Sequence, residues 1–443
     1  MRVRFGSGVL AAVMLLGFPL AADALAIGQA KGTALARPEP LDELIADALA
    51  HNPDLTAARL EAASMRARVG HVRTWPEPEL GGGFALMEMG GGLPQPTMPD
   101  LTLSQAIPDP ARLDLMVQEA GHTAAASEAD ARTLANRIAR QVTDAYADAA
   151  YADGALDENQ AARALTRELV QVATGRYASG QGTMGDVLRA QAQLSRLADA
   201  HNALEQRRAA ALATLGALLG RPAPVPDVAP LSPVKTSGAD WPDRVASASP
   251  EIAAARDEAA AMESRLALTR REREAPSYKA QVGVGLWNPG NQPYVSGMLT
   301  VNLPWLAPVR YHHLVHHATE HAAAARAKVE ATSNELRAEA IIQSSALARD
   351  QKQAVLYEQG VIPQLEAAYR SSLAAYQVGR ADFADVIAEE RDLYRARLSV
   401  LNALAGQVKA RSALEAMAGD FGTGSDAVSG RMTGMGGADG QHQ

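Results

Sequence analysis

The chain has 443 residues, a formal net charge of −8 and no cysteine. Hydrophobic residues make up 47% of the sequence but aromatic residues only 4%, and the many alanines suit closely packed long helices better than a bulky mixed core. The acidic balance argues against a nucleic-acid-binding protein. The lack of cysteine excludes disulfides, thiol catalysis and zinc sites built on thiolates.

The N-terminus is predicted to be an export signal. Two arginines precede an apolar run from Val9 to Leu20, and Ala24-Leu25-Ala26 follows as a small-x-small cleavage site. The run is too short for a membrane anchor, which needs ~20 residues. We therefore expect a signal peptide over residues 1–26, an N-terminal extension over 27–40, and no lipid anchor, because no cysteine is present to carry one.

The rest of the chain is predicted to contain the same unit twice. Asn52-Pro53-Asp54-Leu55 matches Ser249-Pro250-Glu251-Ile252, 197 residues later, and Arg112 matches Arg310 at an offset of 198. Tyr177 matches Tyr376 at an offset of 199. An ordered series of matches indicates tandem repeats. The repeats are expected over residues 41–220 and 241–418, joined by an extended proline-rich linker over 221–240 and followed by a disordered glycine-rich tail over 419–443.

Each repeat is predicted to contain a helix, two short strands and a long helical hairpin. A helix of about 60 residues spans ~90 Å, more than a compact domain holds, and a single hairpin does not bury both of its faces. Oligomerisation is therefore expected. The expected positions are helices about 41–74 and 241–273, strands about 79–89, 100–107, 278–287 and 294–303, and helical hairpins about 112–219 and 310–418.

The predicted strands of the second repeat alternate between apolar and polar positions. Val282, Val284 and Leu286 alternate with glycine or polar residues, and Leu299 and Val301 do the same. About ten residues of such alternation fit a membrane strand with one face towards lipid and one towards water. A soluble hairpin packed on helices is the alternative. Four strands do not close a barrel, whereas three chains would supply twelve.

Three motifs resemble the TolC-like outer membrane efflux family. They are Leu41-Asp42-Glu43-Leu44 through Asn52-Pro53-Asp54-Leu55, then Ser104-Gln105-Ala106-Ile107-Pro108, and finally Arg176-Tyr177-Ala178-Ser179-Gly180 leading to Asp186-Val187-Leu188-Arg189-Ala190-Gln191. The resemblance implies a mainly α fold with a small β part. In it, two tandem repeats of helix, β-hairpin and long helical hairpin build a trimeric periplasmic tunnel, topped by a 12-stranded outer-membrane barrel with four strands per chain.

The same resemblance implies partners and a location. It predicts a homotrimer in the outer membrane of a Gram-negative cell, reaching into the periplasm. A periplasmic adaptor (membrane fusion) protein, an inner-membrane RND transporter and outer-membrane lipid are the expected partners, with no nucleic acid, no cofactor and no enzymatic activity. Multidrug efflux and a type I secretion outlet share this architecture. A soluble periplasmic coiled-coil adaptor is the alternative class, and an enzyme or metal store built on histidine is a third.

Heavy-metal cations are the predicted cargo. The segment from Met87-Glu88-Met89 through Met98-Pro99 is similar to the CzcC- and CusC-like branch, although Pro108-Asp109-Pro110-Ala111-Arg112 departs from its usual pattern. Histidines also gather at the start of the second long helix, and pairs spaced i,i+4 place two imidazoles on one helical face, a workable chelate for copper, zinc, cobalt or nickel. A solvated helix face is the alternative. The histidines are His312, His313, His316, His317 and His321.

The remaining candidate residues lie at the two glycine turns that break the long helices. The resemblance implies that these turns are the periplasmic tips that meet the adaptor, and glycine allows the tight reversal. Nearby carboxylates have two interpretations: they stabilise helix N-termini, or they form an acidic ring at a closed aperture that favours cations. The tip residues are Gly180, Gly182, Thr183, Gly379 and Asp382, and the carboxylates are Asp186, Asp385, Glu389 and Glu390.

Overall fold

A computed structural model of the chain describes residues 40–83, 86–87, 95–96, 100–220, 228–235, 240–287 and 292–421. The predicted signal peptide, nearly all of the N-terminal extension and the tail beyond Phe421 lie outside the described residues. So does most of the segment from Met87 to Pro99 that is similar to the metal-efflux branch. All described residues belong to one compact unit.

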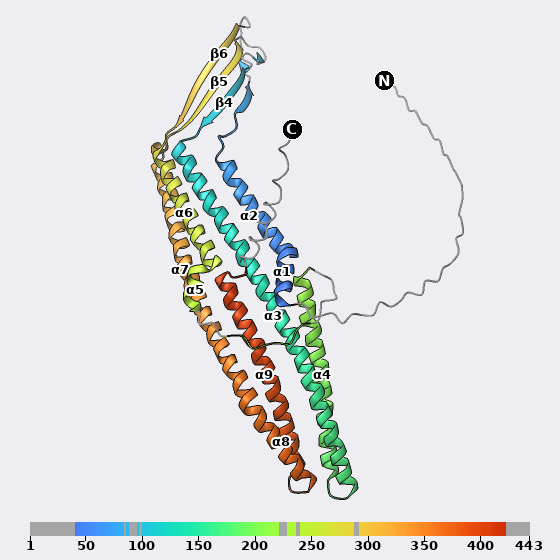
Figure 1. The fold of residues 1–443 in the computed structure, drawn as a ribbon. Helices are drawn as coiled ribbons and strands as arrows, with labels where there is room; N and C mark the ends of the chain where they lie inside the picture. The colour runs from blue at the N-terminus through green and yellow to red at the C-terminus, as the bar shows by residue number, and fades with distance from the viewer. Residues whose placement is uncertain are drawn as a thin grey trace, which may run out of the picture. The chain divides into compact units, whose positions relative to one another are not determined.

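The fold is mainly helical with a small sheet, as the sequence predicts (Figure 1). The first repeat contains α1 (Leu41–His51), α2 (Pro53–Val72), β1 (Glu79–Gly83), β2 (Leu86–Met87), β3 (Gln95–Pro96), β4 (Asp100–Ile107), α3 (Pro110–Ala178) and α4 (Met184–Leu218). The second contains α5 (Trp241–Ala248), α6 (Pro250–Glu274), β5 (Ser277–Trp287), β6 (Gln292–Asn302), the 3₁₀ turn η1 (Pro304–Leu306), α7 (Pro308–Leu356), the π-helical turn η2 (Tyr357–Val361), α8 (Ile362–Gln377) and α9 (Phe383–Ala418).

The first helix of each repeat is broken in two, which differs from the single helix expected from the sequence. The Asn52 side chain accepts hydrogen bonds from the backbone N–H groups of Asp54 and Leu55, at 3.0 and 3.2 Å. This cap starts α2 at Pro53, a residue well suited to the first helical position because its missing N–H is not needed there. Ser249-Pro250 produces the same break between α5 and α6.

A single π-helical turn interrupts the long helix of the second repeat. In the first repeat α3 continues through 69 residues. In the second, α7, η2 and α8 together take its place with 49, 5 and 16 residues, one residue more in total. The interruption leaves the path of the helix largely intact, so both repeats still present a long hairpin (Figure 1).

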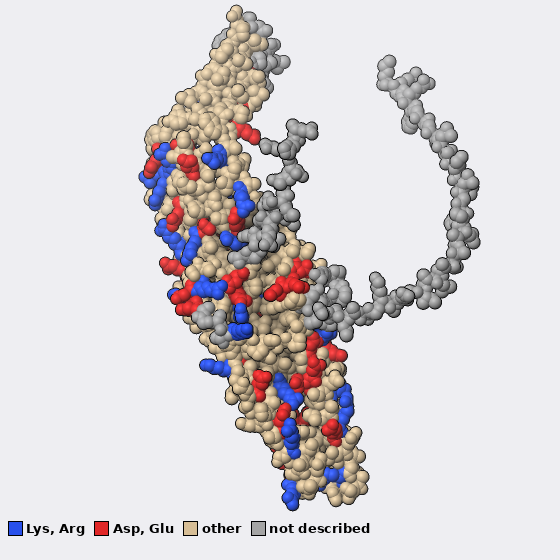
Figure 2. Space-filling view, viewed as in Figure 1, with Lys and Arg blue, Asp and Glu red and all other residues tan. Residues whose placement is uncertain are grey.

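The four main strands form one antiparallel sheet in the order β1-β4-β5-β6. Its centre joins the repeats, because β4 of the first pairs with β5 of the second from Asp100↔Gly285 to Ile107↔Tyr278. Strands β1 and β6 are the two edges. The sheet lies at one end of the helices and the glycine turns at the other (Figure 1). On the face shown in Figure 2, charged side chains are scattered along the helices and are sparse over the strands.

Alanine forms much of the helical core. Helix α3 packs against α2, α4, α6 and α9, and most of its buried residues are alanines. Small side chains allow the helix axes to approach closely, as the composition predicts. Larger apolar residues concentrate in clusters, one of which lies next to the glycine turns and contains Leu169, Val187, Tyr369, Tyr376, Phe383 and Val386.

The linker and the end of α9 tie the two repeats together near the middle of the helices. The Tyr146 hydroxyl on α3 accepts a hydrogen bond from the Ala229 N–H at 2.9 Å. A few residues further along the linker, the Val234 N–H donates to Gln407 Oε1 on α9 at 3.1 Å. One end of the described linker is therefore held by the first repeat and the other by the second.

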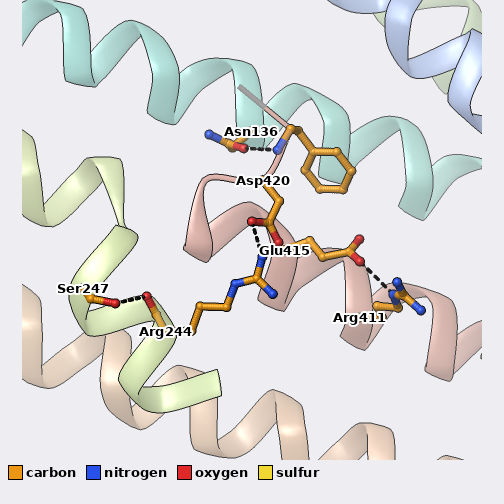
Figure 3. A network of polar contacts seen from close by, with 7 residues as sticks. Asn136, Arg244, Ser247, Arg411, Glu415 and Asp420 are labelled. Carbon is orange, nitrogen blue, oxygen red and sulfur yellow. Dashed lines mark hydrogen bonds and ion pairs between the residues drawn. The ribbon is translucent and has the colours of Figure 1, made fainter. Parts of the chain in front are cut away.

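A second tie lies just beyond α9 (Figure 3). The Phe421 N–H donates to Asn136 Oδ1 on α3 at 3.1 Å, and Arg244 on α5 pairs with Asp420 at 2.7 Å. One turn of α9 earlier, Arg411 pairs with Glu415. The C-terminal end of α9 thus contacts elements of both repeats.

Candidate functional site

The sheet has an apolar and a polar face, because residues that pair directly across strands share a face. Leu101 pairs with Val284 and Val284 with Val295, and all three are at least half exposed. On the other face, Thr102 pairs with Gly283 and Gly283 with Ser296. The exposed apolar side chains of the apolar face are Leu80, Leu101, Leu103, Ile107, Tyr278, Val282, Val284, Leu286, Val295, Leu299 and Val301.

Ion pairs join the start of α3 to the end of α6, next to the sheet. Asp109 caps α3 and accepts a hydrogen bond from Arg271 at the end of α6, at 2.5 Å. That hydrogen bond lowers the pKa of Asp109. Arg112 pairs with Glu272 at 2.8 Å. A cavity of about 640 Å³ lies at this junction and these four residues line it. Each arginine neutralises an acidic residue of the other helix, so we interpret the junction as a structural contact between α3 and α6.

The two glycine turns are built alike. Gly180 and Gly379 have φ values of 73° and 77°, in the left-handed region that non-glycine residues rarely adopt. Thr183 caps α4, and its backbone N–H donates in turn to the Asp186 side chain, so that the two residues form a capping box. Asp186 therefore stabilises the start of its own helix.

The tips of the two hairpins touch each other. The Arg176 guanidinium lies 4.6 Å from the centre of the Tyr376 ring, an arrangement that favours a cation–π interaction. The Tyr376 hydroxyl reaches Asp186 Oδ2 at 3.5 Å, and its ring packs against Phe383. Arg176 also donates to the Gln181 carbonyl at 2.9 Å. A movement of one hairpin away from the other would separate Tyr376 from Arg176 and Asp186.

The predicted aperture carboxylates have three different surroundings. Asp382, the predicted turn residue just before α9, and Asp385 in its first turn are both exposed. Glu389 is partly buried and accepts a hydrogen bond from the Ser372 hydroxyl on α8 at 2.9 Å. Glu390 is only 1% exposed and lies inside the protomer. The burial of Glu390 does not fit a position on an aperture surface in this conformation.

Buried groups surround Glu390. Gln193 on α4 donates to its Oε2 at 3.2 Å, and the Thr166 hydroxyl on α3 lies 3.5 Å from its Oε1. Burial raises the pKa of Glu390 to about 7, although the contacts with Gln193 and Thr166 oppose the rise. Burial, and then the charge of Glu390, also raises the pKa of Tyr369 on α8 to about 12. Helices from both repeats therefore meet at one carboxyl group.

The histidines at the start of α7 are exposed and form two groups. The rings of His317 and His321 are 4.5 Å apart between centroids, and those of His312 and His313 are 5.7 Å apart. His316 Nδ1 lies 3.5 Å from Glu320 Oε1. Among the described residues, no three His, Cys, Asp or Glu side chains converge as they would around a metal ion. The closest pair, His317 and His321, has the predicted i,i+4 spacing.

In the part of the chain that the structure describes, no helix combines the length and the apolar character needed to cross a membrane. Residues 44–221 match the model of the outer membrane efflux protein family. The first repeat of this chain is therefore similar to that family. The match covers the first repeat, and the second repeat has the same order of helix, strands and helical hairpin.

Solved structures with the same fold cover both repeats. The chain is similar to the outer membrane protein VceC from Vibrio cholerae, with 19% identity over 86% of this chain and 96% of that one and a TM-score of 0.73. It is similar to the open state of the MtrE outer membrane channel from Neisseria gonorrhoeae, with 20% identity, coverage of 86% and 88%, and a TM-score of 0.73. It is also similar to CusC, with 17% identity over 89% of this chain and 95% of that one and a TM-score of 0.72. No curated protein sequence matches closely enough to count as a relative.

These comparisons agree with several expectations from the sequence. The fold class, the outer-membrane location and the role as an efflux channel agree with the family and with the channels of the same fold. The matched family is described as an outer membrane efflux protein and the solved structures include outer-membrane channels, which agrees with the expectation of a channel. The tip, carboxylate and histidine assignments stay predictions.

Sequence reasoning missed the contact partners of Glu390. Thr166 and Gln193 lie in the first repeat, 224 and 197 positions away from the glutamate. The one available signal was internal: Gln191, at the usual offset of 199, is the counterpart of Glu390 in the first repeat. A charged residue in one copy and an amide in the other pointed to a difference between the repeats at this place.

Proposed function

We propose that the chain is one subunit of a homotrimeric channel in a tripartite efflux system. Three sheets close a twelve-stranded barrel in the outer membrane, and three pairs of helical hairpins continue it as a tunnel through the periplasm. A periplasmic adaptor binds the hairpin tips, and an inner-membrane RND transporter drives the cargo. The observation that carries the proposal is the sheet with one exposed apolar face at the end of long helical hairpins.

The edges of the sheet support a multimer. Strands β1 and β6 have neighbours on one side only, and an open edge within lipid leaves backbone N–H and C=O groups unpaired, each costing several kcal/mol. Pairing β6 of one subunit with β1 of the next satisfies these groups. The exposed apolar residues of the strands then face the lipid, while Thr102, Lys279 and Ser296 face the water-filled interior.

Membrane fractionation and cross-linking test this assembly. We expect the exported chain in the outer-membrane fraction, and chemical cross-linking should stop at a species of three chains. The soluble periplasmic adaptor is the alternative, and it would appear in the soluble periplasmic fraction. Recovery there, or a monomer under cross-linking conditions, would contradict the channel assembly.

Heavy-metal cations are the proposed cargo. Five histidines within ten residues at the start of α7 support this, and their exposure allows a cation to reach them from solvent. Two imidazoles at i,i+4 spacing bind divalent transition metals, and a conduit requires binding weak enough to release the ion. Multidrug efflux and a type I secretion outlet are the other functions of the same fold.

Deletion of the gene distinguishes these cargoes. Tolerance to copper, silver, zinc, cobalt and several antibiotics is measured in the deletion strain and after complementation. Loss of metal tolerance alone supports cation efflux. Increased antibiotic sensitivity with unchanged metal tolerance refutes it. Complementation with a chain whose five α7 histidines are changed to glutamine then tests their role, with His51→Gln and His201→Gln as a control variant remote from α7.

A further inference from the structure

The polar cluster around Glu390 lies where the two repeats meet near the hairpin tips. Glu390 is on α9, Thr166 on α3 and Gln193 on α4, and these three residues are 1%, 0% and 3% exposed. Tyr369 approaches from α8, and Arg391 and Tyr394 are its neighbours on α9. The carboxyl of Glu390 thus connects the second hairpin to both helices of the first.

Few hydrogen-bond donors surround the carboxyl of Glu390. The Thr166 hydroxyl has a single hydrogen, for which the Ala162 carbonyl at 2.9 Å and Glu390 Oε1 at the longer distance of 3.5 Å compete. An ionised carboxylate would therefore receive one hydrogen bond from Gln193 and a weak one from Thr166. Gln193 Oε1 is buried and accepts no hydrogen bond from the described residues. The O–H group of a protonated Glu390 carboxyl would supply a donor for this amide oxygen.

We infer that Glu390 is a proton-dependent latch: its neutral carboxyl holds the second hairpin against the first, and loss of the proton loosens the tips. An ionised carboxylate at this place would be a buried charge with one hydrogen bond from Gln193 and a weak one from Thr166, an arrangement that is unfavourable. Separation of the hairpins would let water reach the carboxylate. The packed tip is therefore favoured in mildly acidic medium and the separated tip in mildly alkaline medium.

Glu390 is the group of this cluster that titrates near neutral pH. Arg391 lowers the pKa of Glu390 by its charge, but burial acts more strongly in the opposite direction and brings it to about 7. Burial raises the pKa of Tyr369 to about 12 and also raises that of Tyr394, so both stay neutral. Thr166 and Gln193 do not titrate.

The sign and size of the effect follow from linkage. A carboxyl whose pKa is raised from 4.5 to about 7 in the packed state contributes stability that is complete below pH 4.5 and is lost as the pH rises through 7. For a separated state in which the carboxyl has its ordinary pKa, the equilibrium constant for separation rises ~30-fold between pH 5.5 and 8.5.

Local hydrogen exchange of the full chain in detergent micelles measures this. Peptides of α9 that contain residues 386–394 should lose protection ~30-fold from pH 5.5 to 8.5, after correction for the intrinsic exchange rate. The measurement has to be local, because burial also raises the pKa of Asp130 and Asp144 elsewhere in the helices. Glu390→Gln cannot ionise and should match the wild type at pH 5.5 and keep that protection at pH 8.5.

Glu389→Gln is the matched control. Glu389 is the adjacent residue and is only partly buried, so this variant should keep the wild-type dependence on pH. An equal change of protection with pH in the wild type and in Glu390→Gln would overturn the proposal. Protection that does not change with pH in the wild type would also overturn it. Glu390→Gln that is less protected than the wild type at pH 5.5 would also overturn it, because a neutral isostere has to reproduce the protonated form.

Discussion

Removal of one hydroxyl at the linker should weaken the connection between the repeats. Tyr146 is 6% exposed, and its hydroxyl accepts from the Ala229 N–H at 2.9 Å. Tyr146→Phe keeps the ring and its packing and leaves this N–H without its partner. A buried donor that loses its acceptor costs about 1–3 kcal/mol, and the Ala229 N–H is only partly buried. We expect the free energy of unfolding to fall by that amount, towards the lower end where water replaces the hydroxyl.

Urea unfolding of the chain in detergent micelles, followed by helical circular dichroism, gives the comparison. The urea concentration at the midpoint of unfolding should fall, and the slope of the free energy of unfolding against urea concentration should stay the same. Tyr177→Phe is the control, because Tyr177 is 49% exposed at the tip and a surface change of this kind stays within about 0.5 kcal/mol. A Tyr146→Phe variant that unfolds within that margin of the wild type would refute the role given to the hydroxyl.

The other predictions concern the tips. Phe383 is 2% exposed in the cluster next to the turns, so Phe383→Ala should cost about 3–5 kcal/mol and should expose the tip to a protease before the rest of the chain. Gly180→Ala should destabilise the protein by about 1 kcal/mol or more because of the left-handed backbone. Gly175→Ala, with open space around the added Cβ inside α3, should be neutral or stabilising. The midpoints of urea unfolding of the two variants are compared. Between pH 5.5 and 8.5, the wild type should lose about 2 kcal/mol relative to Glu390→Gln, measured as the difference in free energy of unfolding.

The fold class was readable from the sequence because its signals are local. Apolar and polar residues alternate along β5 and β6, the turns contain glycine at matching places, and alanine dominates the helices. The break before Pro53 was missed, although an asparagine followed by proline is a start signal for a helix. The π-helical turn was missed too, although Gly360 lies within it and Pro363 follows two residues after it, and a proline removes a backbone hydrogen bond from a helix.

The surroundings of the candidate site were less readable. The sequence identified Asp186 and Glu390 as carboxylates near the turns but gave no means of separating them. Asp186 interacts with Thr183, three residues away, so its capping role is a local property. Glu390 is buried because helices distant in sequence converge on it, and only the packed structure places Thr166 and Gln193 beside it. Burial, not residue type, distinguishes the two.

The π-helical turn also records how the two repeats diverged. The offset between matching positions is 198 at Arg112 and Arg310 and 199 at Tyr177 and Tyr376, and η2 lies between these points. An extra residue in an α-helix would rotate everything beyond it by about 100°, but a turn with i→i+5 hydrogen bonds absorbs the residue where it occurs. The second repeat therefore has one residue more than the first between these points, and the π-helical turn keeps the faces of α8 in step with the corresponding end of α3.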